Sequence, residues 1–191
     1  MIIHPEGEAV FVEVPKTGST AVTIFLQKQH QWVQNGSGLS IDNTMLGRHG
    51  WLSTEQRDMY ASHGVPIFGV CRNPFERASS LWRGHAPGST SFTEWLKTGR
   101  FQHGNVEIKT TPQTFWLQGC TDVLRYEHLT EDWAAAVAKY PGVLPPLPDG
   151  GLPRVNVSKK TQKPEWDEWQ LEWVRKTFAV DIAFGGYSGP A

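Results

Sequence analysis

Residues 11–20, FVEVPKTGST, change at Pro15 from an apolar run to a basic run rich in hydroxyl groups. The residues before the proline are mostly aromatic or β-branched, which is typical of a buried strand. The segment after the loop, AVTIFLQ, repeats apolar residues at helical spacing: Ala21, Val22, Phe25 and Leu26. The sequence therefore predicts a strand, a tight loop and a helix that begins near Ser19.

The expected loop has the chemistry of an anion site. A helix that begins near Ser19 leaves its first backbone N–H groups without intrahelical partners, and the helix dipole adds positive charge there. Gly18 allows the backbone to approach a ligand closely, and Lys16 adds a full charge. We therefore expect the loop to bind phosphate oxygens through Lys16, Thr17, Gly18, Ser19 and Thr20. The simpler alternative is that Ser19 only caps the helix and that Lys16 is solvated.

This loop differs from the P-loop that binds nucleoside triphosphates, in which a glycine stands well upstream of a Gly-Lys-Ser/Thr group. Here Val12, Glu13 and Val14 occupy the place of the glycine-rich arch, and the lysine precedes the glycine. The predicted loop is therefore shorter than a P-loop, and Lys16 enters at its start.

A second strand and helix are predicted in residues 65–83. The apolar run VPIFGVC indicates a buried strand, and it leads directly into RNPFERASSLWRG. Pro74 suits a helix start, because its missing N–H is not needed there. Arg72 precedes the helix, and i, i+3 spacing places Arg77 and Ser80 on one face. The three groups are expected at the carboxyl end of a strand, where open α/β sheets bind ligands, unless the arginines only face solvent.

Together these motifs resemble the PAPS-dependent sulfotransferases of carbohydrate type, the group that includes heparan sulfate 2-O- and 6-O-sulfotransferases. KTGST is similar to the 5′-phosphosulfate-binding loop of that family, and RNPFERASS is similar to its 3′-phosphate-binding segment. The later RYEHL, residues 125–129, resembles the family's strand-to-helix junction. The resemblance implies 3′-phosphoadenosine 5′-phosphosulfate (PAPS) as sulfuryl donor and 3′-phosphoadenosine 5′-phosphate (PAP) as product. The chain is much shorter than animal members, which fits a soluble bacterial or phage relative.

The resemblance also implies donor contacts late in the chain. RVNVSKKTQK, residues 154–163, stands where the family has an Asn-x-Ser/Thr-Lys loop that closes over the cofactor. Arg154, Ser158 and Lys159 are therefore expected to contact the donor. The alternative is a solvated basic segment.

On the acceptor side, the resemblance implies that His49 is the general base. An imidazole titrates near neutrality, which suits proton removal from a hydroxyl, although His49 could be an ordinary loop histidine among seven. Glu55 is the reserve candidate, although a glutamate on a helix surface is usually solvated. Trp51 and Trp82 could present ring faces to a sugar. A carbohydrate hydroxyl is the expected acceptor, and small alcohols, phenols and peptide tyrosine stay open.

Composition predicts one domain that spans residues 1–191. A chain of 191 residues with 39% hydrophobic content can build one good core. The net charge of −1 gives no basic surface for nucleic acid, and two cysteines cannot form a disulfide framework or a cysteine-rich zinc site. No apolar run has the length of a membrane helix. We expect a cytoplasmic protein that needs no metal and binds neither nucleic acid nor membrane, with its oligomeric state left open.

The expected fold is a P-loop-like, three-layer α/β domain with a central, mainly parallel sheet flanked by helices. Thr130 is the predicted N-cap of a helix over residues 131–140, and a last helix is predicted at about 165–178. Two other functional classes share parts of this pattern. A nucleotide or sugar kinase would need an upstream glycine and a metal-binding acid. A catalytically silent nucleotide- or sugar-binding module would keep Arg72 and the tryptophans without needing His49.

Overall fold

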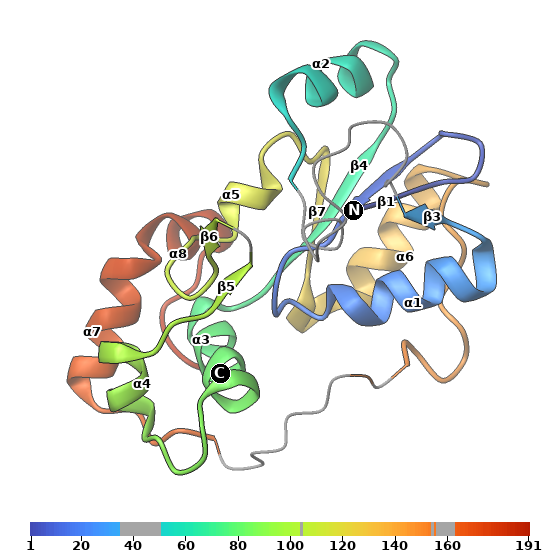
Figure 1. The fold of residues 1–191 in the computed structure, drawn as a ribbon. Helices are drawn as coiled ribbons and strands as arrows, with labels where there is room; N and C mark the ends of the chain where they lie inside the picture. Colours follow the sequence, from blue (N-terminus) through green and yellow to red (C-terminus); the bar gives the residue numbers. More distant parts are fainter. Residues whose placement is uncertain (35–50, 104, 154, 156–162) are drawn as a thin grey trace.

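The computed structural model describes residues 1–34, 51–103, 105–153, 155 and 163–191. Within these ranges the main sheet has five strands in the order β3-β1-β2-β4-β7 (Figure 1). The strands are β1 (Ile2–Ile3), β2 (Val10–Val12), β3 (Val33–Gln34), β4 (Ile67–Cys71) and β7 (Asp122–Arg125). A separate antiparallel hairpin consists of β5 (Gln102–His103) and β6 (Val106–Glu107).

The three longer strands pair in parallel. Phe11 on β2 pairs with Phe68 on β4, and Gly69 on β4 pairs with Val123 on β7. The short strand β1 pairs antiparallel with both β2 and β3. The sheet is therefore mixed, with its longer pairings parallel, and the predicted α/β class is confirmed.

Successive side chains of a strand point to opposite faces of the sheet, so both faces are apolar here. Helices cover both faces and form two cores. Phe11, Phe68 and Val70 pack in a core with α1 (Ser19–His30) and α6 (Leu129–Lys139). Val10, Val12 and Ile67 belong to the opposite core, which α3 (Pro74–His85) shares with three other helices. These are α4 (Phe92–Thr98), α5 (Thr114–Leu117) and α7 (Glu168–Thr177). Figure 1 shows α4 and α7 beside α3, and α8 (Ala179–Gly185) beside α5 and α7, all away from α6.

Local capping explains where several helices begin. Asn73 caps α3 through its side chain, and Pro74 is the first helical residue, as predicted. The helix α2 (Thr54–Ser62) begins after a capping box formed by Ser53. The prediction of Thr130 as an N-cap is wrong: the 3₁₀ helix Tyr126–His128 continues into α6, which starts at Leu129.

The last predicted helix is shorter than expected. Asp167 accepts a hydrogen bond from the backbone N–H of Gln170, so α7 begins at Glu168 rather than near 165. The chain then turns at Phe178 into α8. No helix in the described ranges is both long enough and apolar enough to cross a membrane.

Candidate anion-binding site

The loop after β2 has the geometry predicted for an anion site. Lys16 has φ 68° and Gly18 has φ 85°, so both lie in the left-handed region that favours glycine. A lysine there stores about 1 kcal/mol of strain, which points to a constraint on its position. Gly18 is the N-cap of α1, without a side-chain cap bond, and Ser19 is the first helical residue. The Ala21 N–H donates to the Gly18 carbonyl at 3.0 Å, so the N–H groups of Ser19 and Thr20 are the ones that this 12-residue helix offers to a ligand.

Two of the loop hydroxyls brace the loop itself. Thr17 Oγ1 donates to the carbonyl of Val14 at 3.0 Å, and Ser19 Oγ donates to the same oxygen at 2.7 Å. Thr17 and Ser19 are buried, whereas Thr20 is half-buried in the first turn of α1. Thr17 and Ser19, predicted to donate to phosphate, thus use their protons to shape the turn. The backbone N–H groups, the Lys16 ammonium and the Thr20 hydroxyl are left as donors, because none of these side-chain groups bonds within the described residues.

Arg77 supports the same loop from beneath. Its side chain is fully buried, and its guanidinium donates to three carbonyls: Pro15 at 3.0 Å, Thr111 at 3.2 Å and Ile108 at 3.3 Å. Burial lowers the pKa of Arg77 to about 10, partly offset by the charge of Asp181. The sequence predicted Arg77 as a phosphate ligand, but in this structure its donors face the protein backbone.

Arg72 lies directly after β4, as predicted, and its backbone is held by Gln113. The Gln113 side chain accepts from the Arg72 N–H at 2.8 Å and donates to the Arg72 carbonyl at 2.7 Å. The Arg72 guanidinium reaches the Lys16 carbonyl at 3.4 Å, so the first and second motifs meet. Its Nε is buried and has no hydrogen-bond partner among the described residues.

The RYEHL segment joins the two motifs. The Tyr126 ring lies against Gly18, and the Arg72 guanidinium stacks over it at 4.4 Å from the ring centre. Glu127 accepts a hydrogen bond from the Asn73 N–H at 2.8 Å and another from the Tyr187 hydroxyl at 3.1 Å. The resemblance had marked this segment only as a junction, so these contacts of Tyr126 and Glu127 were missed.

A cluster of three cations is the dominant electrostatic feature of the site. It consists of Lys16, Arg72 and Arg83, from the loop, the end of β4 and the last turn of α3. Burial lowers the pKa of Lys16, and the charges of Arg72, Arg83 and Arg77 lower it further. Burial also lowers the pKa of Arg72. The lowered pKa values mean that keeping these side chains charged costs free energy in the unliganded protein. A bound anion would reduce that cost.

Few groups compensate this cationic cluster. Glu76 lies 4.0 Å from the Arg72 guanidinium and also pairs with Lys163 at 3.7 Å, and the charge of Glu127 likewise raises the pKa of Arg72. Neither the Lys16 ammonium nor the Arg83 guanidinium forms a hydrogen bond or ion pair within the described part of the chain. The cluster therefore has the charge and the free donors needed to bind an anion.

The remaining predicted residues are dispersed. Ser80 is on α3 and 8% exposed. Trp82 donates to the Thr90 carbonyl, and Trp51 is 41% exposed and packs against Phe115. His49, Arg154, Ser158 and Lys159 lie outside the described residues.

Glu55 is separated from the cationic cluster by the length of β4. It lies in the exposed first turn of α2, which precedes β4, whereas α3 follows that strand (Figure 1). Hydrogen bonding with the Ser53 side chain lowers the pKa of Glu55, which makes it a weaker base.

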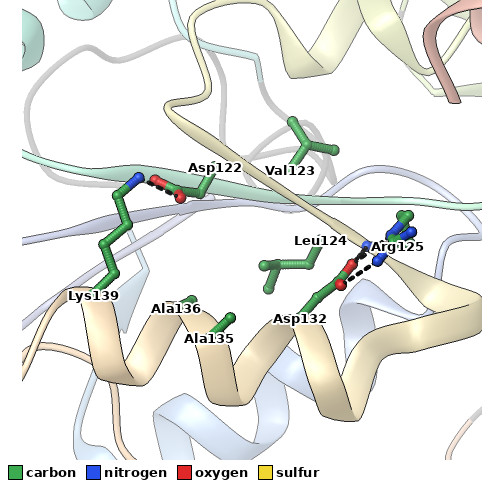
Figure 2. A pocket seen from close by; sticks show the side chains of 8 residues that line it. All are labelled: Asp122, Val123, Leu124, Arg125, Asp132, Ala135, Ala136 and Lys139. Atoms are coloured by element: carbon green, nitrogen blue, oxygen red, sulfur yellow. Dashed lines mark hydrogen bonds and ion pairs between the residues drawn. The ribbon is translucent and has the colours of Figure 1, made fainter.

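A cavity of about 300 Å³ lies elsewhere, between β7 and α6 (Figure 2). Its acidic side chains are already paired: Asp122 with Lys139 at 2.8 Å, and Asp132 with Arg125 at 2.7 Å. Because these charges are internally neutralised, the cavity offers less to a charged ligand than the cationic cluster does. No group of three or more metal-ligating His, Cys, Asp or Glu side chains occurs among the described residues.

Fold and site together define an α/β protein with a cationic cluster, a candidate anion-binding site, beside two parallel strands. A scan against protein-family models, a search of curated proteins and a search of solved structures find no match. Function must therefore be inferred from the chemistry of the site.

Proposed function

We propose that the protein is a sulfotransferase that moves a sulfuryl group from PAPS to an acceptor hydroxyl on a carbohydrate. The observation that supports this most directly is the cationic cluster of Lys16, Arg72 and Arg83 beside the N-terminus of α1. Partly buried cations that acidic groups compensate only in part are costly, and a multiply charged anion recovers that free energy on binding. PAPS is such an anion, with a phosphosulfate and a second phosphate on one ribose.

The order of the residues in the loop after β2 favours PAPS over a nucleoside triphosphate as the ligand. Lys16 precedes Gly18, and the strand residues Val12 and Val14 replace the glycine-rich arch of a P-loop. The second motif brings Arg72 to the carbonyl of Lys16, so two anionic groups of one ligand can bind side by side. The resemblance to the carbohydrate sulfotransferases assigns the 5′-phosphosulfate to Lys16 and the 3′-phosphate to Arg72.

In the proposed reaction the acceptor oxygen attacks sulfur in line with the leaving phosphate. The bond between sulfur and the bridging phosphate oxygen breaks, and the electron pair of that bond stays on the phosphate oxygen of PAP. The acceptor oxygen and sulfur then form a sulfate ester. Lys16 and the first N–H groups of α1 stabilise the charge that develops on the leaving oxygen. Lys16, Arg72 and the first N–H groups of α1 offset part of the negative charge of the product, and the proposal includes no bridging metal ion.

The acceptor proton must pass to a general base, and we retain His49 for this role. The competing candidate, Glu55, lies on α2 at the other end of β4, and its lowered pKa makes proton uptake less favourable. His49→Ala is expected to abolish sulfuryl transfer and to leave PAP binding intact. Unchanged turnover in His49→Ala would remove the base assignment but not the donor site.

The test of the donor site is calorimetric titration with PAP, compared with ATP in the presence of magnesium. We expect metal-independent PAP binding that is lost in Lys16→Ala and weakened at least tenfold in Arg72→Ala, since a charge-assisted contact contributes about 1.5–3 kcal/mol. Lys176→Ala is the matched control, because Lys176 is exposed on α7 and pairs with Glu172.

The outcome separates the proposed function from its alternatives. Preference for ATP with magnesium would favour a nucleotide or sugar kinase, and PAP binding without sulfuryl transfer to any hydroxyl would favour a silent module. No nucleotide binding would refute the donor site. Transfer of labelled sulfuryl groups from PAPS to a panel of oligosaccharides then identifies the acceptor.

A further inference from the structure

Arg83 is a positively charged side chain that neither sequence motif includes. It lies in the last turn of α3, half-buried, and its Nε is buried without a hydrogen-bond partner among the residues described. A guanidinium nitrogen that is withdrawn from water without a protein partner costs free energy. Such a group is expected to have a ligand.

The other arginine of this helix has no donor directed to a ligand. Arg77 is fully buried, and three carbonyls accept its hydrogen bonds. A nucleotide could reach Arg77 only if the loop that it supports were opened. Of the two, Arg83 is the one whose guanidinium forms no hydrogen bond or ion pair with the residues that the structure describes.

We propose that Arg83, rather than Arg77, is the arginine of α3 that binds the donor, and that it contacts the anionic group held by Lys16. This inference rests on the proposed function. It assigns the 5′-phosphosulfate end of the donor to Lys16 and Arg83, and the 3′-phosphate to Arg72.

The packing of Lys16 places its ammonium beside this turn of α3. A Cβ built on Gly84, the residue after Arg83, would lie 3.0 Å from Lys16 Nζ. Gly84 therefore provides the space in which the ammonium lies against the helix, although glycine costs about 1 kcal/mol relative to alanine in a helix interior. The last turn of α3 and the Lys16 loop thus form one cationic surface.

Helix geometry is consistent with this assignment. Arg83 follows Ser80 by three residues and Glu76 by seven, so all three belong to one face of α3. Glu76 is the residue that contacts Arg72, at 4.0 Å, which identifies this face as the one directed at the site. A planar guanidinium on this face can bind two oxygens of a phosphate or sulfate at once.

The test compares Arg83→Met with Arg83→Lys, and uses PAP, adenosine 5′-phosphate and adenosine 3′-phosphate as probes. Met keeps the length of the apolar stem and removes the charge, whereas Lys keeps the charge without the planar fork. Arg175→Met is the matched control, because Arg175 is an exposed arginine on α7 that pairs with Glu168. Circular dichroism and thermal unfolding establish that each variant is folded.

We expect Arg83→Met to weaken PAP and adenosine 5′-phosphate by about tenfold to a hundredfold, with a smaller loss in Arg83→Lys. Adenosine 3′-phosphate should change by less than about twofold, and Arg175→Met should change none of the three. PAP affinity within about twofold of wild type in Arg83→Met would overturn the inference and leave the proposed function standing. A loss confined to adenosine 3′-phosphate would overturn the assignment of Arg83 to the Lys16 side. If wild-type protein bound no PAP, the proposed function would fail first.

Discussion

Gly18→Ala is expected to destabilise the protein for two separable reasons. Gly18 has φ 85°, so a side chain there costs about 1 kcal/mol in backbone strain. The added Cβ would also lie 2.6 and 2.7 Å from two ring carbons of Tyr126. Tyr126 is 41% exposed and can swing outward, but it then loses its contact with the Arg72 guanidinium at 4.4 Å. That loss adds about 0.5–1 kcal/mol, for a total near 2 kcal/mol.

Gly64→Ala is the matched control for this prediction. Gly64 has φ 67°, and a Cβ built there meets nothing within 4 Å, so only the backbone strain of about 1 kcal/mol applies. Urea denaturation of the two variants gives the difference directly. In a Tyr126→Ala background, Gly18→Ala should cost no more than Gly64→Ala, because the ring is gone. Equal costs of Gly18→Ala with and without the Tyr126 ring would refute the reasoning.

Three further predictions concern titration, positioning and thiol reactivity. PAP affinity should fall as pH rises, and the fall should start below the ordinary lysine pKa of 10.5, because burial and then the neighbouring arginines lower the pKa of Lys16. Calorimetry across the alkaline range checks this. Constant affinity up to about pH 10 would contradict it. Gln113→Ala should lower the free energy of unfolding, measured in urea, by about 2–3 kcal/mol and should weaken PAP binding, because it leaves the Arg72 backbone N–H and carbonyl unpaired. An unchanged free energy of unfolding would contradict this. Cys71 and Cys120 should react slowly with thiol reagents in the native protein and fast in the unfolded protein. The reason is that burial raises the pKa of both thiols, that of Cys120 to about 12. Rapid labelling of the native protein would contradict this.

Local signals allowed the elements around the site to be predicted from the sequence. A short apolar run, Pro15 and Gly18 place the strand, the turn and the start of α1, because each depends on neighbouring residues alone. Asn73 and Pro74 likewise mark the start of α3. The two-residue strands β1 and β3 are too short to show a period of two, so their antiparallel pairing could not be predicted.

The hydrogen-bond acceptors of the site's side chains could not be predicted, because these acceptors lie on segments that are distant in the sequence. Arg77 binds the carbonyls of Ile108 and Thr111, and no local pattern near residue 77 reveals that contact. Arg83 could have been noticed, because it follows Ser80 by three residues, a helical spacing that the motif already uses. The assignment of His49 stays a prediction from resemblance.

Through the buried guanidinium of Arg77, the conformation of the Lys16 loop depends on residues far away in the sequence. This guanidinium links Pro15, 62 positions earlier in the chain, to Ile108 and Thr111, which lie 31 and 34 positions later. The loop around Lys16 loses one of its supports when these later residues no longer pack against α3, although the Thr17 and Ser19 hydroxyls still hold the turn. Transient opening of the segment near residue 110 would therefore loosen the loop as well, and amide hydrogens in both places should exchange with solvent in one cooperative event. Ligand affinity in this protein is thus linked to the local stability of a segment that contributes no side chain to the cationic cluster.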